Sequence, residues 1–95
     1  MGRRRSKRSK MDLYAEVLEV ISRYPESVRI TRLSYGVGVP VDRLKTIVEV
    51  LCSNGLVRRS TNVEEVTYSA TSRGLEFLDA YWKMKGFFEI LGENR

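Results

Sequence analysis

The sequence of 95 residues contains no histidine and no glutamine, and it has a single cysteine and two prolines. Without histidine there is no ordinary general base near neutral pH, no imidazole metal ligand and no histidine-dependent catalytic triad. One cysteine can form neither an internal disulfide nor a cysteine zinc site, and we interpret Cys52 as core packing in a reducing, cytoplasmic compartment. We therefore expect no enzymatic activity, no metal and no cofactor.

Long hydrophobic runs are also absent. No stretch approaches the ~20 apolar residues of a transmembrane helix, and no apolar signal-peptide centre follows the basic start. We expect no membrane partner, and no motif indicates a small-molecule ligand. The composition, with 42% hydrophobic and 31% charged residues, is that of an ordinary globular domain. The lack of glutamine beside many Glu, Lys and Arg residues is compatible with a heat-adapted source.

The net charge of +5 is concentrated at the N-terminus. Residues 1–10 hold six of the 17 Lys and Arg residues, whereas residues 11–95 hold 11 cations against 12 acidic side chains. This segment cannot bury enough apolar surface to offset the entropy of ordering, so we predict a disordered basic arm. Such an arm can follow a phosphate backbone, although a solubility or targeting segment is the alternative. The arm residues expected to bind DNA are Arg3, Arg4, Arg5, Lys7, Arg8 and Lys10.

Residues 31–55 form the segment around which the chain is organised. A short helix over residues 31–35, capped by Thr31, precedes a glycine-bearing bend at 36–39. Pro40 fits the start of a second helix and Gly55 its left-handed end. The apolar positions of that second helix recur at helical spacing: Val41, Leu44, Ile47, Val48 and Leu51. Two helices joined by such a turn predict a helix-turn-helix.

The flanking segments complete a recognisable order. A helix from Asp12 to about Tyr24 is followed by a possible lone strand at 27–30. Residues 56–59 and 65–70 have strand periodicity and predict a hairpin with a loop at 60–64. Thr71 is placed to cap a final helix from Ser72 to about Leu91. A helix-turn-helix followed by a hairpin is the winged-helix arrangement, so we predict a mainly α (α+β) fold with a winged-helix domain over residues 11–71.

The final helix carries two apolar stripes. Leu75, Leu78 and Trp82 predict a contact with the rest of the domain. A second series follows at spacings of 4, 3, 4 and 3, like a heptad seam: Phe77, Tyr81, Met84, Phe88 and Leu91. Two seams are more than a monomer of this size can cover, so we predict a homodimer through residues 72–95. The alternative is one wide core face with a frayed end.

The predicted recognition helix and wing have mixed charge. The residues expected to contact DNA from the folded domain are Arg32, Arg43, Lys45, Thr46, Arg58 and Arg59. Phosphates would be repelled by Glu49, although its carboxylate can accept a hydrogen bond from cytosine N4 or pair with Lys45. Glu64 and Glu65 oppose deep insertion of the wing into a groove. We expect modest sequence preference, and the pattern leaves open whether Tyr35 is core or surface.

Several segments resemble those of a known family: Lys7-Arg8-Ser9-Lys10-Met11, Thr31-Arg32-Leu33-Ser34-Tyr35, Asn54-Gly55-Leu56-Val57 and Tyr68-Ser69-Ala70-Thr71-Ser72-Arg73-Gly74-Leu75-Glu76-Phe77-Leu78. Together they resemble the small archaeal winged-helix DNA-binding proteins of the ten-kilodalton Sulfolobus chromatin-protein type. The resemblance implies a DNA-binding dimer joined by an antiparallel coiled coil of C-terminal helices. The sequence departs from that pattern at Val39-Pro40 and in its acidic wing.

The preferred interpretation is a homodimer that binds double-stranded DNA, as a chromatin-architectural protein or a transcription regulator associated with the nucleoid. A competing interpretation is a protein-interaction winged helix whose aromatic C-terminal seam recruits a partner protein. RNA binding is a third.

Overall fold

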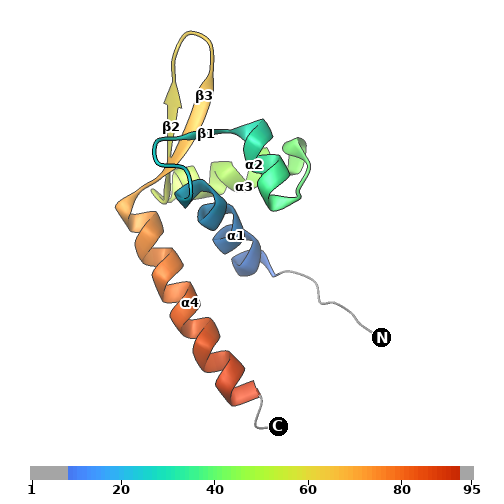
Figure 1. Cartoon of the computed structure of the whole chain (residues 1–95), viewed down its shortest axis with the longest axis vertical. Coiled ribbons are helices and arrows are strands. Elements are labelled where there is room, and N and C mark those ends of the chain that lie inside the picture. The colour runs from blue at the N-terminus through green and yellow to red at the C-terminus, as the bar shows by residue number, and fades with distance from the viewer. Residues whose placement is uncertain (1–8, 93–95) are drawn as a thin grey trace.

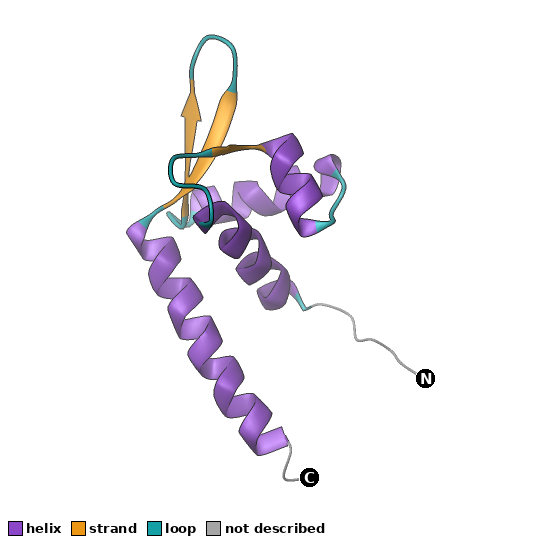
Figure 2. Cartoon of the chain, in the orientation of Figure 1, coloured by secondary structure: helices purple, strands orange, loops and turns teal. Residues whose placement is uncertain are grey.

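The computed structural model describes residues 9–92. It contains four helices and three strands, arranged as Figures 1 and 2 show. In chain order these are α1 (Lys10–Ser22), β1 (Val28–Arg29), α2 (Ile30–Val37), α3 (Val41–Ser53), β2 (Val57–Thr61), β3 (Val66–Ala70) and α4 (Ser72–Gly92). The predicted fold class, a mainly helical winged helix with a long C-terminal helix, is confirmed.

The strands form one antiparallel sheet in the order β1-β3-β2. In the central strand, β3, Tyr68 lies opposite Val28 of β1 and Ala70 lies opposite Val57 of β2. Residues 27–30 are therefore not a lone strand, because β1 extends the hairpin by a third strand. The hairpin of β2 and β3 projects from one end of the domain as the wing (Figure 1).

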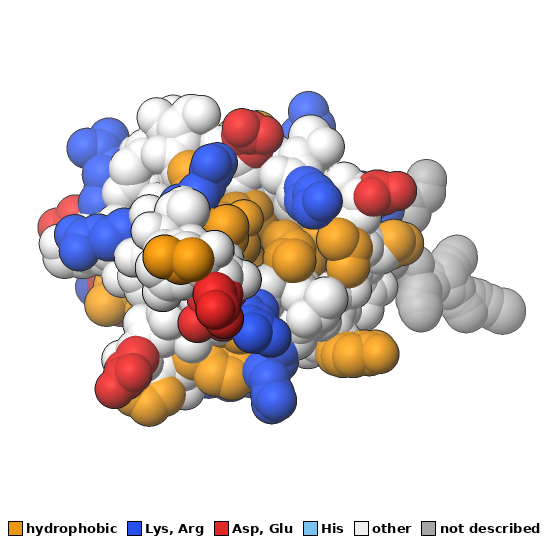
Figure 3. All heavy atoms as spheres, turned by 90° about the horizontal axis from the view of Figure 1, so that it is seen from above, with side chains coloured by type: hydrophobic (Ala, Val, Ile, Leu, Met, Phe, Trp, Pro, Cys, Tyr) orange, Lys and Arg blue, Asp and Glu red, His pale blue; other side chains and the backbone are white. Residues whose placement is uncertain are grey.

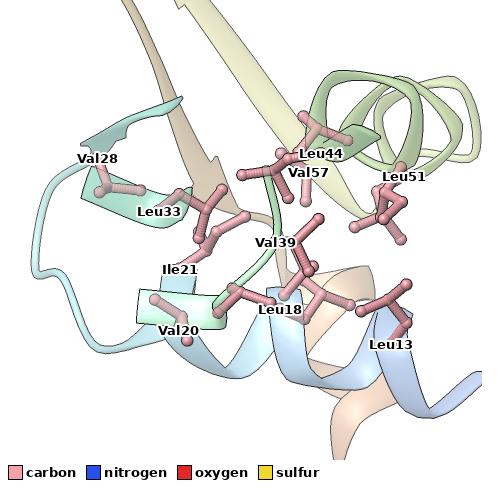
Figure 4. Close-up of a cluster of buried hydrophobic side chains, with 14 residues drawn as sticks. Leu13, Leu18, Val20, Ile21, Val28, Leu33, Val39, Leu44, Leu51 and Val57 are labelled. Carbon is pink, nitrogen blue, oxygen red and sulfur yellow. The ribbon is translucent and has the colours of Figure 1, made fainter. Parts of the chain in front are cut away.

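The core lies between α1, α2, α3 and the root of the wing. Figure 4 shows Leu18, Leu33 and Leu44 from the three helices converging on it, with Val57 from β2. All four are at most 3% exposed, and no polar or charged residue among positions 9–92 is buried. The predicted apolar face of α3 is confirmed except at Val41, which is only half-buried. Apolar burial is thus the main force that holds the helix-turn-helix together.

The first helix begins two residues earlier than predicted. Ser9 caps it: its Oγ accepts a hydrogen bond from the Asp12 backbone N–H at 3.0 Å, and its own N–H donates to Asp12 Oδ2 at 3.2 Å. This reciprocal capping box satisfies two donors that a helix start otherwise leaves unpaired. Lys10, assigned from the sequence to the disordered arm, is therefore the first residue of α1.

The second helix also differs from its prediction. It begins at Ile30 with Arg29 as N-cap and no side-chain capping bond, so Thr31 lies inside the helix rather than at its cap. It continues through Gly36 to Val37, and its C-cap is Gly38, whose φ of 79° is left-handed. The bend between α2 and α3 is accordingly shorter than the four residues predicted.

The start of α4 is fixed to the end of the helix-turn-helix. Thr71 caps α4 as predicted, because its Oγ1 accepts from the Gly74 N–H at 3.0 Å and donates to the Gly55 carbonyl at 2.7 Å. A Cβ at Gly74 would lie 2.1 Å from the Leu56 carbonyl oxygen and 3.0 Å from a Leu18 methyl. Only glycine permits this approach of α4 to the chain that enters β2.

The face that α4 turns toward the domain is only partly the predicted one, because Leu78 of the predicted stripe lies on it and Leu75 does not. Phe77 and Leu78 pack against the core, whereas Leu75 is 48% exposed. Trp82, also half exposed, contacts α1 through its Nε1, which donates to Glu19 Oε1 at 3.0 Å. Two stripes of similar spacing run along this helix, and the docking of α1 decides which of them is covered.

A polar contact joins the first turn of α1 to the middle of α4. The Tyr81 hydroxyl donates to Asp12 Oδ1, and Lys85 Nζ lies 3.9 Å from the same oxygen. The hydrogen bond from Tyr81, together with the one from the backbone N–H of Ser9, lowers the pKa of the Asp12 carboxyl. Burial, together with the bond to Asp12, raises the pKa of Tyr81 to about 12. The contact is therefore strongest while Asp12 is ionised and Tyr81 is protonated.

Replacing Gly74 by alanine should destabilise the fold by about 1–3 kcal/mol, because the added methyl group overlaps a backbone carbonyl that cannot rotate away. Urea unfolding measures the change. Gly86→Ala is the matched control on the same helix, since its Cβ would meet nothing within 4 Å, and it should be neutral or stabilising by up to about 1 kcal/mol. Equal stabilities for the two variants would contradict the close approach.

Tyr81→Phe removes the donor to Asp12 and should lower the free energy of unfolding by on the order of 1 kcal/mol near neutral pH. The folded pKa of Asp12 lies below its ordinary 3.8, so this stabilisation is present above about pH 4 and is lost as pH falls further. The raised pKa of Tyr81 keeps it intact below about pH 10 and removes it toward pH 12.

Urea unfolding of the wild type and Tyr81→Phe across this pH range should therefore give a stability difference that closes at both ends. Tyr24→Phe removes a tyrosine hydroxyl at another place in the fold and serves as the control. A difference for Tyr81→Phe that does not vary with pH would show that the hydroxyl does not act through Asp12.

Candidate nucleic-acid interface

The exposed side of α3 is the expected recognition surface, and it carries both signs of charge. Because Leu44, Ile47 and Leu51 face the core, the opposite side of the helix is left to solvent. The side chains exposed there include Asp42, Arg43, Lys45, Thr46, Glu49 and Ser53. Figure 3, which views the molecule from the wing end, shows basic and acidic side chains interspersed with hydrophobic ones. The folded domain thus has no single strongly basic face at this end.

The predicted DNA-contacting residues fall into three groups. Arg43, Lys45 and Thr46 are exposed on α3, Arg58 and Arg59 on β2, and Arg32 on α2. Lys10 is exposed in the first turn of α1. The remaining arm residues, Arg3, Arg4, Arg5, Lys7 and Arg8, lie outside the described residues. The cations of the helix-turn-helix and the wing are therefore all at the surface, as expected.

The side chains of Arg58 and Arg59 lie on opposite faces of β2. Successive residues of a strand point to opposite faces, so only one of them can face α3. That residue is Arg59, whose Nη2 lies 3.8 Å from Glu49 Oε2. The side chains remain 46% and 68% exposed, respectively. Glu49 thus pairs across the fold with the wing, and not with Lys45 of its own helix as the sequence allowed.

The wing is less acidic in effect than its sequence indicates. Arg29 Nε of β1 donates to Glu65 Oε1 at 2.6 Å, which neutralises one of the two acids expected to oppose groove insertion. Asn62 Oδ1 accepts from the backbone N–H groups of Glu64 and Glu65, both at 3.2 Å, and so shapes the turn. In the turn between β2 and β3, Val63 is 98% exposed, and the sequence analysis did not single it out.

The structure shows whether two residues of the helix-turn-helix, Tyr35 and Cys52, lie at the surface or in the core. Tyr35 is 90% exposed on α2, next to Thr31 and Arg32, so it is a surface residue. Cys52 packs partly buried against the core, in agreement with its assignment as packing. Burial raises the pKa of its thiol, which therefore stays protonated at neutral pH.

The C-terminal half of α4 forms a second candidate surface. Of the predicted seam, Phe77 and Tyr81 are partly covered by α1, while the rest is exposed. The exposed apolar residues of this half are Met84, Phe87, Phe88, Ile90 and Leu91. Phe87, which the sequence analysis missed, follows Met84 and precedes Leu91 at spacings of 3 and 4, the same signal as the predicted seam.

An open groove of ≈ 430 Å³ runs between the first turn of α1 and α4. Its walls are mainly apolar: Met11, Phe77, Ala80, Tyr81, Met84 and Phe88 line it, with Ser9, Asp12 and Lys85 at its edge. The groove is continuous with the exposed apolar residues of α4, because Met84 and Phe88 belong to both. The groove and the exposed residues therefore form one continuous apolar surface.

Two other kinds of site were sought in residues 9–92. No three histidine, cysteine, aspartate or glutamate side chains cluster there as metal ligands. None of the helices in that range is both long enough and apolar enough to cross a membrane.

Solved structures with the same arrangement include DNA-binding proteins and transcriptional regulators. The DNA-binding protein Sso10a-2 from Sulfolobus solfataricus superposes with a TM-score of 0.78 at 22% identity, over 92% of this chain and 88% of that one. A MarR-family transcriptional regulator from Silicibacter pomeroyi gives 0.69 at 22% identity, over 79% and 50%. Lactococcus lactis ZitR in complex with DNA gives 0.62 at 14% identity, over 95% and 64%.

The chain spans about half the length of the first MarR-family structure it matches, and nearly all of Sso10a-2. At these identities the likeness shows the fold. No curated protein matches the sequence. The predicted resemblance to the small archaeal winged-helix proteins is confirmed by the match to Sso10a-2 and by a family model described as winged helix-turn-helix, which covers residues 7–89. The chain belongs to the winged helix-turn-helix family.

Proposed function

We propose that the protein binds double-stranded DNA as a homodimer, in a chromatin-architectural or transcription-regulatory role. The observation that carries this proposal is the exposed α3 flanked by a projecting wing, with cations on both elements. An α-helix of this kind fits the major groove of B-DNA. DNA-binding relatives of the same fold, Sso10a-2 and ZitR, support the assignment.

The charges of the folded domain suit moderate attraction to phosphates. Two acids near the expected interface, Glu49 and Glu65, are each paired with an arginine. Within residues 9–92, the other cations of this region form no ion pair: Arg32, Arg43, Lys45 and Arg58. These four are available to phosphates. Residues 1–8 of the basic arm add five more cations to a domain that is otherwise nearly neutral. We assign the arm most of the salt-dependent affinity and α3 the orientation on the duplex.

The homodimer is supported by the apolar surface of α4. Five large apolar side chains lie exposed along its C-terminal half, and the groove beside α1 continues them. An exposed patch of this kind marks an interaction surface. A second copy offers the same apolar stripe, and its α4, packed against this one, would cover Met84 and Phe88 and fill the groove. The helix would then set the distance between two DNA-binding units.

DNA binding is tested by titrating salt against affinity for a duplex of random sequence, using the full chain and a variant that lacks residues 1–8. This truncation keeps Ser9 and therefore the cap of α1. Loss of five cations should flatten the slope of log K against log salt by about 4–5, and Arg43→Ala should flatten it by about 1.

Lys83→Ala, on α4 and away from the expected interface, is the matched control and should leave the slope unchanged. A full-length protein that does not bind duplex DNA at low salt would refute the proposal. Binding abolished by the truncation and indifferent to Arg43→Ala would restrict the activity to the arm and remove α3 from the interface.

The dimer is tested by sedimentation of Phe88→Glu and Met84→Glu. The wild type should sediment at twice the 11.0 kDa chain mass and both variants at the chain mass, because a charge in an apolar helix pair is left unpaired. Val63→Glu places the same charge on an exposed apolar residue of the wing and should stay dimeric. A monomeric wild type would instead favour the competing function, recruitment of a different protein by the same face.

A further inference from the structure

The ion pair between Glu49 and Arg59 joins the recognition helix to the wing. Arg59 lies on β2 and Glu49 on the exposed side of α3, and both side chains remain accessible to solvent. The guanidinium also approaches Cys52, one turn along α3, but that thiol is protonated and does not compete for the charge. Glu49 is therefore the anionic partner of Arg59 in the folded domain.

This pairing creates a conflict when DNA approaches. Arg59 contacts a phosphate best by turning away from Glu49, because the Glu49 carboxylate, 3.8 Å from the guanidinium, repels the phosphate that Arg59 would bind. Once released, the Glu49 carboxylate would face a groove lined by phosphates with no cation beside it. An unpaired charge in such a place is strongly unfavourable. The exchange therefore requires a hydrogen-bond donor from the DNA.

Cytosine is the base that supplies such a donor most cleanly. In the major groove its N4 amino group has an acceptor on one side only, O6 of the paired guanine, whereas the N6 amino group of adenine lies between its own N7 and thymine O4. A carboxylate is attracted by both amino groups but repelled by N7. Glutamate at the outer face of a recognition helix accordingly discriminates in favour of a C·G pair.

We propose that Glu49 is a specificity-determining residue that couples recognition of cytosine to the release of Arg59 onto the phosphate backbone. On a duplex with cytosine in reach, Glu49 accepts from cytosine N4 and Arg59 makes an additional phosphate contact. On a duplex without cytosine, Glu49 competes with the phosphates for Arg59 and weakens its contact with the backbone. The inference rests on the proposed function, because it requires α3 to lie in the major groove.

The test compares two duplexes of equal length, one of alternating A·T pairs and one of alternating G·C pairs, by fluorescence anisotropy over a range of salt. The wild type should bind the G·C duplex roughly tenfold more tightly. Its slope of log K against log salt should be steeper there by about 1, which corresponds to one extra phosphate contact.

Glu49→Ala should raise affinity for the A·T duplex, steepen its slope by about 1 and remove most of the preference between duplexes. Arg59→Ala should equalise the slopes while keeping part of the preference, because Glu49 remains. Glu76→Ala, an exposed acid on α4, is the matched control for a simple change in net charge and should preserve the wild-type ratio of affinities.

Circular dichroism identifies any variant that fails to fold, and Glu49→Gln then replaces Glu49→Ala with the same expectation for the slopes. Glu49→Ala that binds but keeps both the wild-type preference and the difference in slopes overturns this inference and leaves the proposed function intact. A wild type that binds neither duplex at low salt overturns both.

Discussion

The structure depends on the close approach of the first turn of α4 to the segment that follows α3. The Thr71 N–H donates to the Leu56 carbonyl at 3.1 Å, Thr71 Oγ1 donates to the Gly55 carbonyl at 2.7 Å, and Gly74 leaves room for the Leu56 oxygen. At this point the end of the recognition helix, both strands of the wing and the start of the long helix meet. The directions in which wing and α4 leave the domain are therefore set by one small junction.

Three acidic side chains of the folded domain are paired with basic or hydroxyl groups of the same chain. Glu49 and Glu65 pair with Arg59 and Arg29, and Asp12 binds Tyr81 with Lys85 nearby. Exposed pairs of this kind contribute little to stability in water, so their main effect is on what the surface offers to a ligand. They reduce the field of the domain, and the net charge of +5 comes from the five cations of residues 1–8, which lie outside the described range.

The parts of the fold that follow local rules could be predicted from the sequence. Helical periodicity located α1, α3 and α4, and strand alternation located the hairpin. Each of these patterns is formed by residues that are close together in the sequence. The winged-helix order of elements followed from these. The pairing of β1 with β3 and the contact between Arg29 and Glu65, 36 positions apart, depend on how distant segments dock, and no local pattern records them.

The same limit applies to the candidate site. The cations on α3 and β2 are at the surface as predicted, since an exposed face follows from the apolar one. Spacing alone does not say which apolar stripe of α4 meets α1, so Phe77 and Tyr81 were assigned wholly to the outer seam and Phe87 was missed. Equally, the partner of Glu49 comes from another element, and helical spacing offered only Lys45.

The capped start of α1 has a geometric consequence. Ser9 lies at the end of α1 that points away from the wing (Figure 1). The chain therefore enters the folded domain far from the wing hairpin, so the capping box of Ser9 and Asp12 and the turn of the wing belong to separate surfaces of the molecule.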